Sequence, residues 1–188
     1  MSLMPFEART EEANSDAAWY ALYTRHQHEK TVASLLLSKG IQVFLPLYSS
    51  VHKWRDRDRM LLLPLYPGYV FLRDRLNCKL HILTTPGVHS IVGTAGGPEP
   101  IPEFEIDAVK RIIESSLAVE PHPFLRCGDW ARVTRGPLEG IEGFLLRKKN
   151  AYRLVLSVEM LMKSVAVEID ASMVERISGR SWSPIGRG

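Results

Sequence analysis

The side chains that could do covalent or metal chemistry are few and widely spaced. His26 and His28 stand two positions apart and could offer two nitrogens to a metal ion, but no carboxylate or thiol at ligand spacing completes a site. The two cysteines, Cys78 and Cys127, are too few for a four-ligand zinc site and too far apart for a disulfide framework. The residue order indicates no Ser-His-Asp triad or carboxylate pair. We therefore expect no catalytic activity, no metal and no cofactor.

Basic side chains form two clusters of the kind that contacts a polyanion. The first lies at 25–30, directly after the aromatic segment 19–23, and the second, segment 52–59, contains four basic and two acidic side chains. If segment 52–59 forms the tip of a hairpin, its basic side chains could lie along DNA phosphates. Alternating charges also describe an ordinary solvated hairpin held by cross-strand pairs. The candidate nucleic-acid-binding residues are Arg25, His26, His28, Lys30, Lys53, Trp54, Arg55, Arg57 and Arg59.

The composition of the chain allows packed cores and a reducing compartment. Its 188 residues are 45% hydrophobic with a net charge of +3, which permits contact with a polyanion without demanding it. The N-terminus lacks a basic segment followed by an apolar one, and the longest apolar run, 61–72, is interrupted by Pro64, Pro67 and Gly68. We expect a cytoplasmic monomer with no membrane partner.

The first half of the chain alternates between strand and helix patterns. Residues 19–24 form a β-rich run, and apolar residues from position 32 follow helical spacing until Gly40. Further strands are predicted at 41–47, 60–65 and 68–73, with 52–59 as a hairpin tip, and helices at 76–83 and 106–117. The class is therefore α+β, with an α/β sandwich-like domain over 18–118 whose four-stranded, mainly antiparallel sheet is flanked by helices.

The second half has an all-β pattern. Prolines within 120–124 predict a linker at 119–125, and a strand, a glycine-controlled turn and a second strand follow at 128–145. Runs at 153–158, 165–169 and 174–177 raise the count to about five strands, which suits a small SH3-like barrel over 126–178. Residues 1–17 and 179–188 are predicted to be flexible tails.

Both halves resemble the NusG family of transcription elongation factors. Residues 128–145, with Gly136-Pro137, Gly140 and Gly143 before a basic strand, resemble a KOW motif. The segments 19–23, 65–71 and 85–88 are similar, in order, to successive landmarks of the NusG N-terminal domain. Together the two resemblances span residues 19–117 and 125–178.

The resemblance implies a surface that binds the clamp helices of RNA polymerase. In this family the surface is an apolar, aromatic depression, and the matching residues here are Tyr23, Tyr66, Pro67, Tyr69 and Phe71. The alternative for each ring is a place in the core. If Val70 and Leu72 face the core, Tyr69 and Phe71 share the opposite face of the strand, because side chains alternate along it.

Two departures from the family pattern indicate a specialised paralogue with an antitermination role. Met160, Leu161, Met162 and Lys163 replace the Ile-Phe-Gly-Arg tip with which the housekeeping second domain meets termination factor Rho or a small-subunit ribosomal protein, so those contacts are expected to be altered or absent. Residues 78–80 replace a His-Thr-Thr segment of the RfaH branch. In that branch the segment contacts the second jaw of the RNA polymerase cleft, so this contact is in doubt here. The basic cluster after position 24 matches a region that reads non-template DNA in that branch.

Two alternatives stay open at this point. A ribosome-associated KOW RNA-binding protein would share the second domain, so the first domain distinguishes the two functions. Residues 154–165 also fit one helical face, and in the RfaH branch this domain can refold as a helical hairpin; the default expectation here is a freely tethered barrel.

Overall fold

The chain combines helices with antiparallel sheets, as predicted. The computed structural model describes residues 16–54, 57–123, 129–148, 151–158, 161 and 163–177. Its contacts divide the chain into two compact units, Met1–Leu45 with Gly68–Ile101, and Pro46–Pro67 with Pro102–Gly188. No helix within the described ranges is long and apolar enough to span a membrane.

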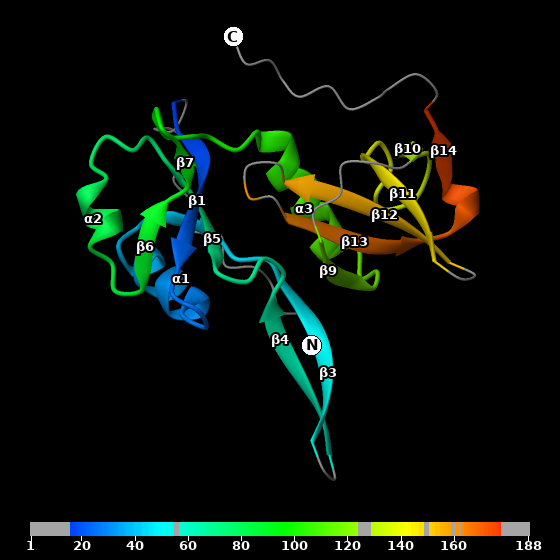
Figure 1. Cartoon of the computed structure of the whole chain (residues 1–188), viewed down its shortest axis with the longest axis horizontal. Coiled ribbons are helices and arrows are strands. Elements are labelled where there is room, and N and C mark those ends of the chain that lie inside the picture. Colours follow the sequence, from blue (N-terminus) through cyan, green and yellow to red (C-terminus); the bar gives the residue numbers. More distant parts are fainter. Residues whose placement is uncertain are drawn as a thin grey trace. The chain divides into compact units, whose positions relative to one another are not determined.

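The first unit is built on a four-stranded antiparallel sheet of order β2-β5-β1-β6 (Figure 1). Its fourth strand is β6, whereas residues 60–65, which we predicted as one of the four strands of the first domain, lie in a separate hairpin. The apolar pattern of residues 88–91 is too short to predict a strand by itself. The elements of this unit are β1 (Ala18–Thr24), α1 (Glu29–Ser38), β2 (Gln42–Phe44), β5 (Tyr69–Asp74), α2 (Leu80–Leu83), β6 (Val88–Ile91), β7 (Gly93–Thr94) and β8 (Gly97–Pro98).

One face of this sheet forms a core with the two helices. Leu22, Val70 and Leu72 project from β1 and β5 and cluster with residues of α1 and α2, among them Leu36 and Ile82. All five side chains are fully buried. The three strand residues share one face of the sheet because successive side chains along a strand point to opposite sides. Gly40, at a φ of +77°, lies just beyond α1 as predicted, because an L side chain rarely adopts that conformation.

The second unit contains a long two-stranded ribbon, β3 (Leu47–Trp54) with β4 (Arg57–Pro64), drawn in cyan and green in Figure 1. The ladder runs from Leu47 opposite Pro64 to Trp54 opposite Arg57. The predicted hairpin tip is therefore shorter than 52–59, because strand pairing continues into it from both sides. Helix α3 (Glu103–Glu114) follows in this unit and begins directly after Pro102, a residue type that is well tolerated at the start of a helix because it lacks an N–H.

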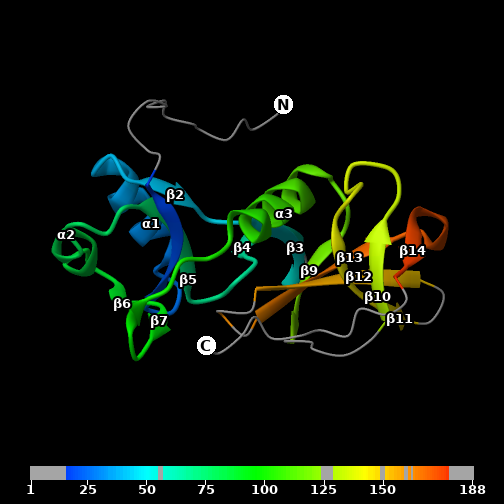
Figure 2. The ribbon, with the colours of Figure 1, turned by 90° about the horizontal axis from the view of Figure 1, so that it is seen from above.

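The remaining strands form a six-stranded antiparallel sheet of order β14-β10-β11-β12-β13-β9 (Figure 2). We predicted five strands here and a linker at 119–125, but residues 119–123 are strand β9, paired with β13 from Val119 opposite Val167 to Pro123 opposite Lys163. Prolines do not prevent this pairing because β9 is an edge strand, where a missing N–H can face away from the ladder. The strands are β9 (Val119–Pro123), β10 (Asp129–Val133), β11 (Glu142–Lys148), β12 (Ala151–Val158), β13 (Lys163–Ile169) and β14 (Val174–Arg176).

The turn between β10 and β11 shows why the KOW-like glycines are needed. Gly136 and Gly140 have φ values of +90° and +83°, and a Cβ on Gly143 would lie 2.6 Å from the carbonyl oxygen of Val155. Arg111 of α3 donates from Nη2 to the carbonyl oxygens of Pro137 (3.0 Å) and Glu139 (2.7 Å) in the same turn. Helix α3 is thus hydrogen-bonded to the β10–β11 turn of the six-stranded sheet, which we call the second sheet. The prediction of a freely tethered barrel did not include this contact.

One residue at the start of the first domain differs from expectation, and the segment that fits both a strand and a helix has the expected strand form. Ala17, assigned to the N-terminal tail, is buried, and its carbonyl accepts a hydrogen bond from Arg73 Nε at 3.3 Å. Residues 154–158 and 165 lie in β12 and β13, so the structure shows the strand form of the segment that also fits a helical face. Residues 1–15 and 178–188 lie outside the described ranges.

Candidate functional site

Three aromatic rings lie in a row at the end of β1, and we call Tyr23, Tyr69 and His89 the aromatic row. The Tyr23 and Tyr69 ring centroids are 5.6 Å apart, and the His89 ring stacks on Tyr23 at 5.5 Å with an interplanar angle of 29°. Tyr23 is 47% exposed, His89 is exposed and Tyr69 is half-buried. The row therefore offers an apolar, polarisable surface to a partner.

A buried carboxylate holds the turn that carries one end of this row. Glu29, in the first turn of α1, is only 4% exposed, and its Oε1 accepts the N–H of Gly68 at 2.7 Å. The Gly68 carbonyl in turn accepts the N–H of Thr24 at 2.8 Å. Gly68 has a φ of +85°, a conformation that L residues rarely adopt. These bonds fix the backbone immediately before Tyr69 against the end of β1.

Two members of the predicted polymerase-binding set are interior residues. Phe71 is 0% exposed and packs 6.0 Å from Phe44, which meets Trp19 at 6.3 Å. Alternation correctly places Phe71 on the face opposite Val70, but that face is itself a covered apolar layer. Tyr66 is 1% exposed, so it too cannot offer its ring to a partner in this conformation.

Burial also sets the protonation of the tyrosines. Burial raises the pKa of Tyr66, and the negative charge of Glu105 raises it further. Partial burial raises the pKa of Tyr69, with a smaller contribution from neighbouring Tyr23. Tyr69 is therefore neutral at physiological pH. Pro67, the remaining member of the predicted set, is exposed.

The first basic cluster lies on the surface next to the aromatic row in the chain. Arg25, His26, His28 and Lys30 are all exposed, and His28 Nδ1 lies 3.1 Å from the carbonyl oxygen of His26. Glu29 is the one acidic residue between positions 23 and 30, and its carboxylate is turned inward to Gly68. The exposed side chains of this stretch are consequently neutral or cationic.

The second basic cluster, 52–59, and the predicted partner-binding tip of the KOW domain, residues 160–163, which we call the KOW tip, are only partly within the described residues. Arg59 is exposed at the start of β4, whereas Arg55 and the side chains of Lys53, Trp54 and Arg57 lie outside the described part of the chain. At the KOW tip, Met160 and Met162 are likewise outside it. Leu161 is buried and Lys163 is exposed, so of these two only Lys163 offers its side chain to a partner.

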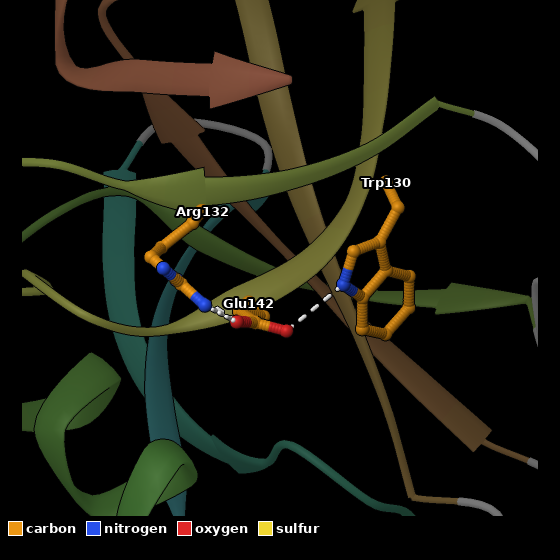
Figure 3. Close-up of polar contacts among 3 residues, drawn as sticks. All are labelled: Trp130, Arg132 and Glu142. Atoms are coloured by element: carbon orange, nitrogen blue, oxygen red, sulfur yellow. Dashed lines mark hydrogen bonds and ion pairs between the residues drawn. The ribbon is translucent and has the colours of Figure 1, made fainter. Parts of the chain in front are cut away.

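A polar network on the second sheet was not predicted from the sequence (Figure 3). Trp130 Nε1 donates to Glu142 Oε2 at 3.0 Å, and Arg132 Nε donates to Glu142 Oε1 at 2.9 Å. The Trp130 ring meets Phe144 edge-on at 4.8 Å. Because Arg132 is opposite Glu142 in the ladder, its charge is neutralised locally. This network stabilises the β10–β11 pair and leaves no unbalanced cation at Arg132.

Sequence reasoning missed two residues that shape the candidate surface, Glu29 and His89. A glutamate in the first turn of a helix normally signals a favourable charge near the helix N-terminus, not a buried acceptor for a turn 39 residues away. His89 follows Gly87-Val88 without any pattern that singles it out. Among the described residues, no group of three or more His, Cys, Asp or Glu side chains could hold a metal ion.

Comparisons with known proteins agree with this architecture. The family described as "Transcription termination factor nusG" matches residues 17–110. The transcription termination/antitermination proteins NusG of Campylobacter jejuni and Pseudomonas aeruginosa are each 26% identical to the chain, and each match covers 85% of it and 97% or 98% of the relative. A solved structure of Thermotoga maritima NusG aligns over 86% of this chain and 97% of its own, with 19% identity and a TM-score of 0.55, which supports the fold.

The family match covers the first half of the chain, where the sequence alone could distinguish a NusG protein from a ribosomal KOW protein. The matches to the two relatives extend across most of both chains, so they include the second domain as well. The chain therefore belongs to the NusG family of transcription termination/antitermination factors, which are not enzymes.

Proposed function

We propose that this protein binds the clamp helices of RNA polymerase through Tyr23 and Tyr69, together with Pro67, and promotes processive elongation or antitermination. The observation that carries the proposal is the exposed Tyr23 ring beside Tyr69, on a turn held by the buried Glu29 carboxylate. A partly exposed aromatic pair on a rigid support loses little conformational entropy when a partner covers it. Such residues are typical binding hot spots.

Charge insertion on this surface tests the proposal. Tyr23→Asp should weaken binding to purified RNA polymerase by roughly 30-fold or more, since loss of a hot spot costs about 2 kcal/mol or more. Phe104→Asp is the matched control, because Phe104 is an exposed ring on α3, outside the aromatic row. Binding is measured by biolayer interferometry, and circular dichroism verifies that both variants fold. Unchanged affinity of a folded Tyr23→Asp protein would refute the assignment.

We further propose that the basic clusters contact non-template or upstream DNA in the elongation complex. The exposed Arg25, His26, His28 and Lys30 and the exposed Arg59 support this role, with Lys53, Trp54, Arg55 and Arg57 as the other members of the hairpin cluster. Simultaneous charge reversal of Arg55, Arg57 and Arg59 should flatten the salt dependence of binding to elongation complexes, by about 0.9 in the logarithmic slope for each phosphate that is no longer neutralised. An unchanged slope would leave the hairpin as solvated surface.

The second domain is proposed to recruit other factors, and the departures at 160–163 favour a specialised paralogue. Because Leu161 is buried, Lys163 is the member of this tip whose exposure is established. We expect the isolated protein to bind Rho or a small-subunit ribosomal protein more weakly than a housekeeping relative does. A pull-down with each purified partner, with the housekeeping relative as the reference, tests this: equal capture of Rho would favour the housekeeping role.

A further inference from the structure

An irregularity between two strands brings His89 to the aromatic row. In the β1–β6 ladder Tyr23 is opposite Ser90 and Thr24 is opposite Val88, so the register skips His89. Such a bulge redirects the side chain of the extra residue, and bulges of this kind often accompany functional sites. Val88 and Ile91 pack against the core of the first unit, which anchors the strand on both sides of His89.

The bulge leaves His89 with a fixed ring and unused nitrogens. Its ring stacks on Tyr23, yet within the described part of the chain no hydrogen bond reaches its nitrogens. A neutral imidazole carries one N–H donor and a protonated one carries two. The side chain is exposed, so these donors point to solvent or to whatever covers the row.

The surroundings indicate which chemistry would meet this donor. Arg25 and His26 are exposed directly after Tyr23 and Thr24, while the carboxylate of Glu29 is turned inward. Residues 86–91 contain no acidic side chain. The surface around the row is thus aromatic with cationic or neutral donors at its margin, and it is complementary to an apolar patch bordered by a carboxylate.

We infer that His89 is a contact residue of the polymerase-binding surface and donates a hydrogen bond to a carboxylate on the polymerase, beside the apolar patch that receives Tyr23 and Tyr69. This inference rests on the proposed function. His89 acts as a specificity residue, because a partner that lacks an acceptor at this point would leave the imidazole N–H without a partner after its water is removed.

Three variants test the inference in the full chain. His89→Ala should lower affinity for purified RNA polymerase about tenfold. His89→Phe keeps a ring that can stack on Tyr23 but removes the donor, so it should lose a similar factor. Ser90→Ala, at the adjacent exposed position of β6, is the matched control and should bind like the wild type. Thermal unfolding of each variant checks that the fold is retained.

The outcomes separate this inference from the proposed function. If Tyr23→Asp loses binding and folded His89→Ala stays within twofold of the wild type, the contact assigned to His89 is wrong and the polymerase surface stands. If His89→Phe binds like the wild type while His89→Ala is weakened, the stacked ring matters and the hydrogen bond to a carboxylate is refuted. If neither Tyr23→Asp nor His89→Ala weakens binding, both proposals fail.

Discussion

The pH dependence of the free energy of unfolding tests whether Tyr66 is an interior residue or a contact residue. The side chain is 1% exposed, and burial followed by the charge of Glu105 raises its pKa above the ordinary value of 10.0. The folded state therefore holds the phenol proton more tightly than the unfolded chain does. The stabilisation is complete below pH 10 and is lost as pH rises above it, because the unfolded chain releases a proton that the folded chain keeps.

The size of the effect follows from the number of protons involved. One proton retained by the folded state changes the free energy of unfolding by about 1.4 kcal/mol per pH unit above the unfolded pKa. Between pH 10 and pH 11.5 the contribution of Tyr66 is about 2 kcal/mol. That is a sizeable share of the roughly 5–15 kcal/mol that stabilises an ordinary domain.

Urea unfolding at pH 8, 10, 11 and 11.5 measures this contribution. Tyr66→Phe removes the titrating group and should lose about 2 kcal/mol less than the wild type between pH 10 and 11.5. Tyr23→Phe, at an exposed ring, is the control for changes elsewhere in the chain. Parallel pH profiles for the wild type and Tyr66→Phe would mean that the phenol is accessible to solvent, and would restore Tyr66 as a candidate contact residue.

The remaining predictions concern the second sheet and its contact with α3. Gly143→Ala should destabilise the domain by several kcal/mol because its Cβ would clash with the carbonyl oxygen of Val155 in β12. Gly140→Ala has open space around it and should cost only about 1 kcal/mol of backbone strain; chemical denaturation compares the two variants. A hydrogen bond from the residue 172 N–H lowers the pKa of Asp170, so its stabilisation is present above the unfolded value of 3.8 and is lost as pH falls below it; Asp170→Asn should show a shallower acid-unfolding profile. Arg111→Ala should lower the unfolding free energy by about 1 kcal/mol relative to Lys110→Ala, and its amide spectrum should change at 136–140; unchanged signals there would contradict the bonds from α3.

Side-chain alternation along a strand and the backbone preference of glycine depend only on neighbouring residues. They correctly predicted the features of this fold that depend only on neighbouring residues. The face assignment of Val70 and Leu72 is correct because successive side chains on a strand point to opposite sides. Gly40 ends α1 for a reason contained in its own backbone. The strands of the second half, from β10 to β14, follow the predicted runs closely.

The missed features depend on partners distant in the sequence. Alternation says that Phe71 faces away from Val70, but it cannot say that this face is covered, so it does not distinguish a surface position from the interior one that Phe71 occupies. The prolines of β9 are compatible with a strand only because β13 supplies an edge to pair with, which no local pattern indicates. His89 joins the aromatic row through a register change between β1 and β6, and register is a property of two strands together.

Glu29 links the two candidate contact surfaces of the first unit. Its carboxylate accepts the N–H of Gly68 and so positions the backbone that leads into Tyr69. The same inward orientation removes the one negative charge from the exposed stretch between Arg25 and Lys30, which keeps that stretch compatible with phosphate. A single buried acid therefore serves both the aromatic row and the basic cluster: it holds one in place and leaves the other without a competing charge. The geometry proposed for polymerase contact and the electrostatics proposed for DNA contact consequently depend on the same hydrogen bond.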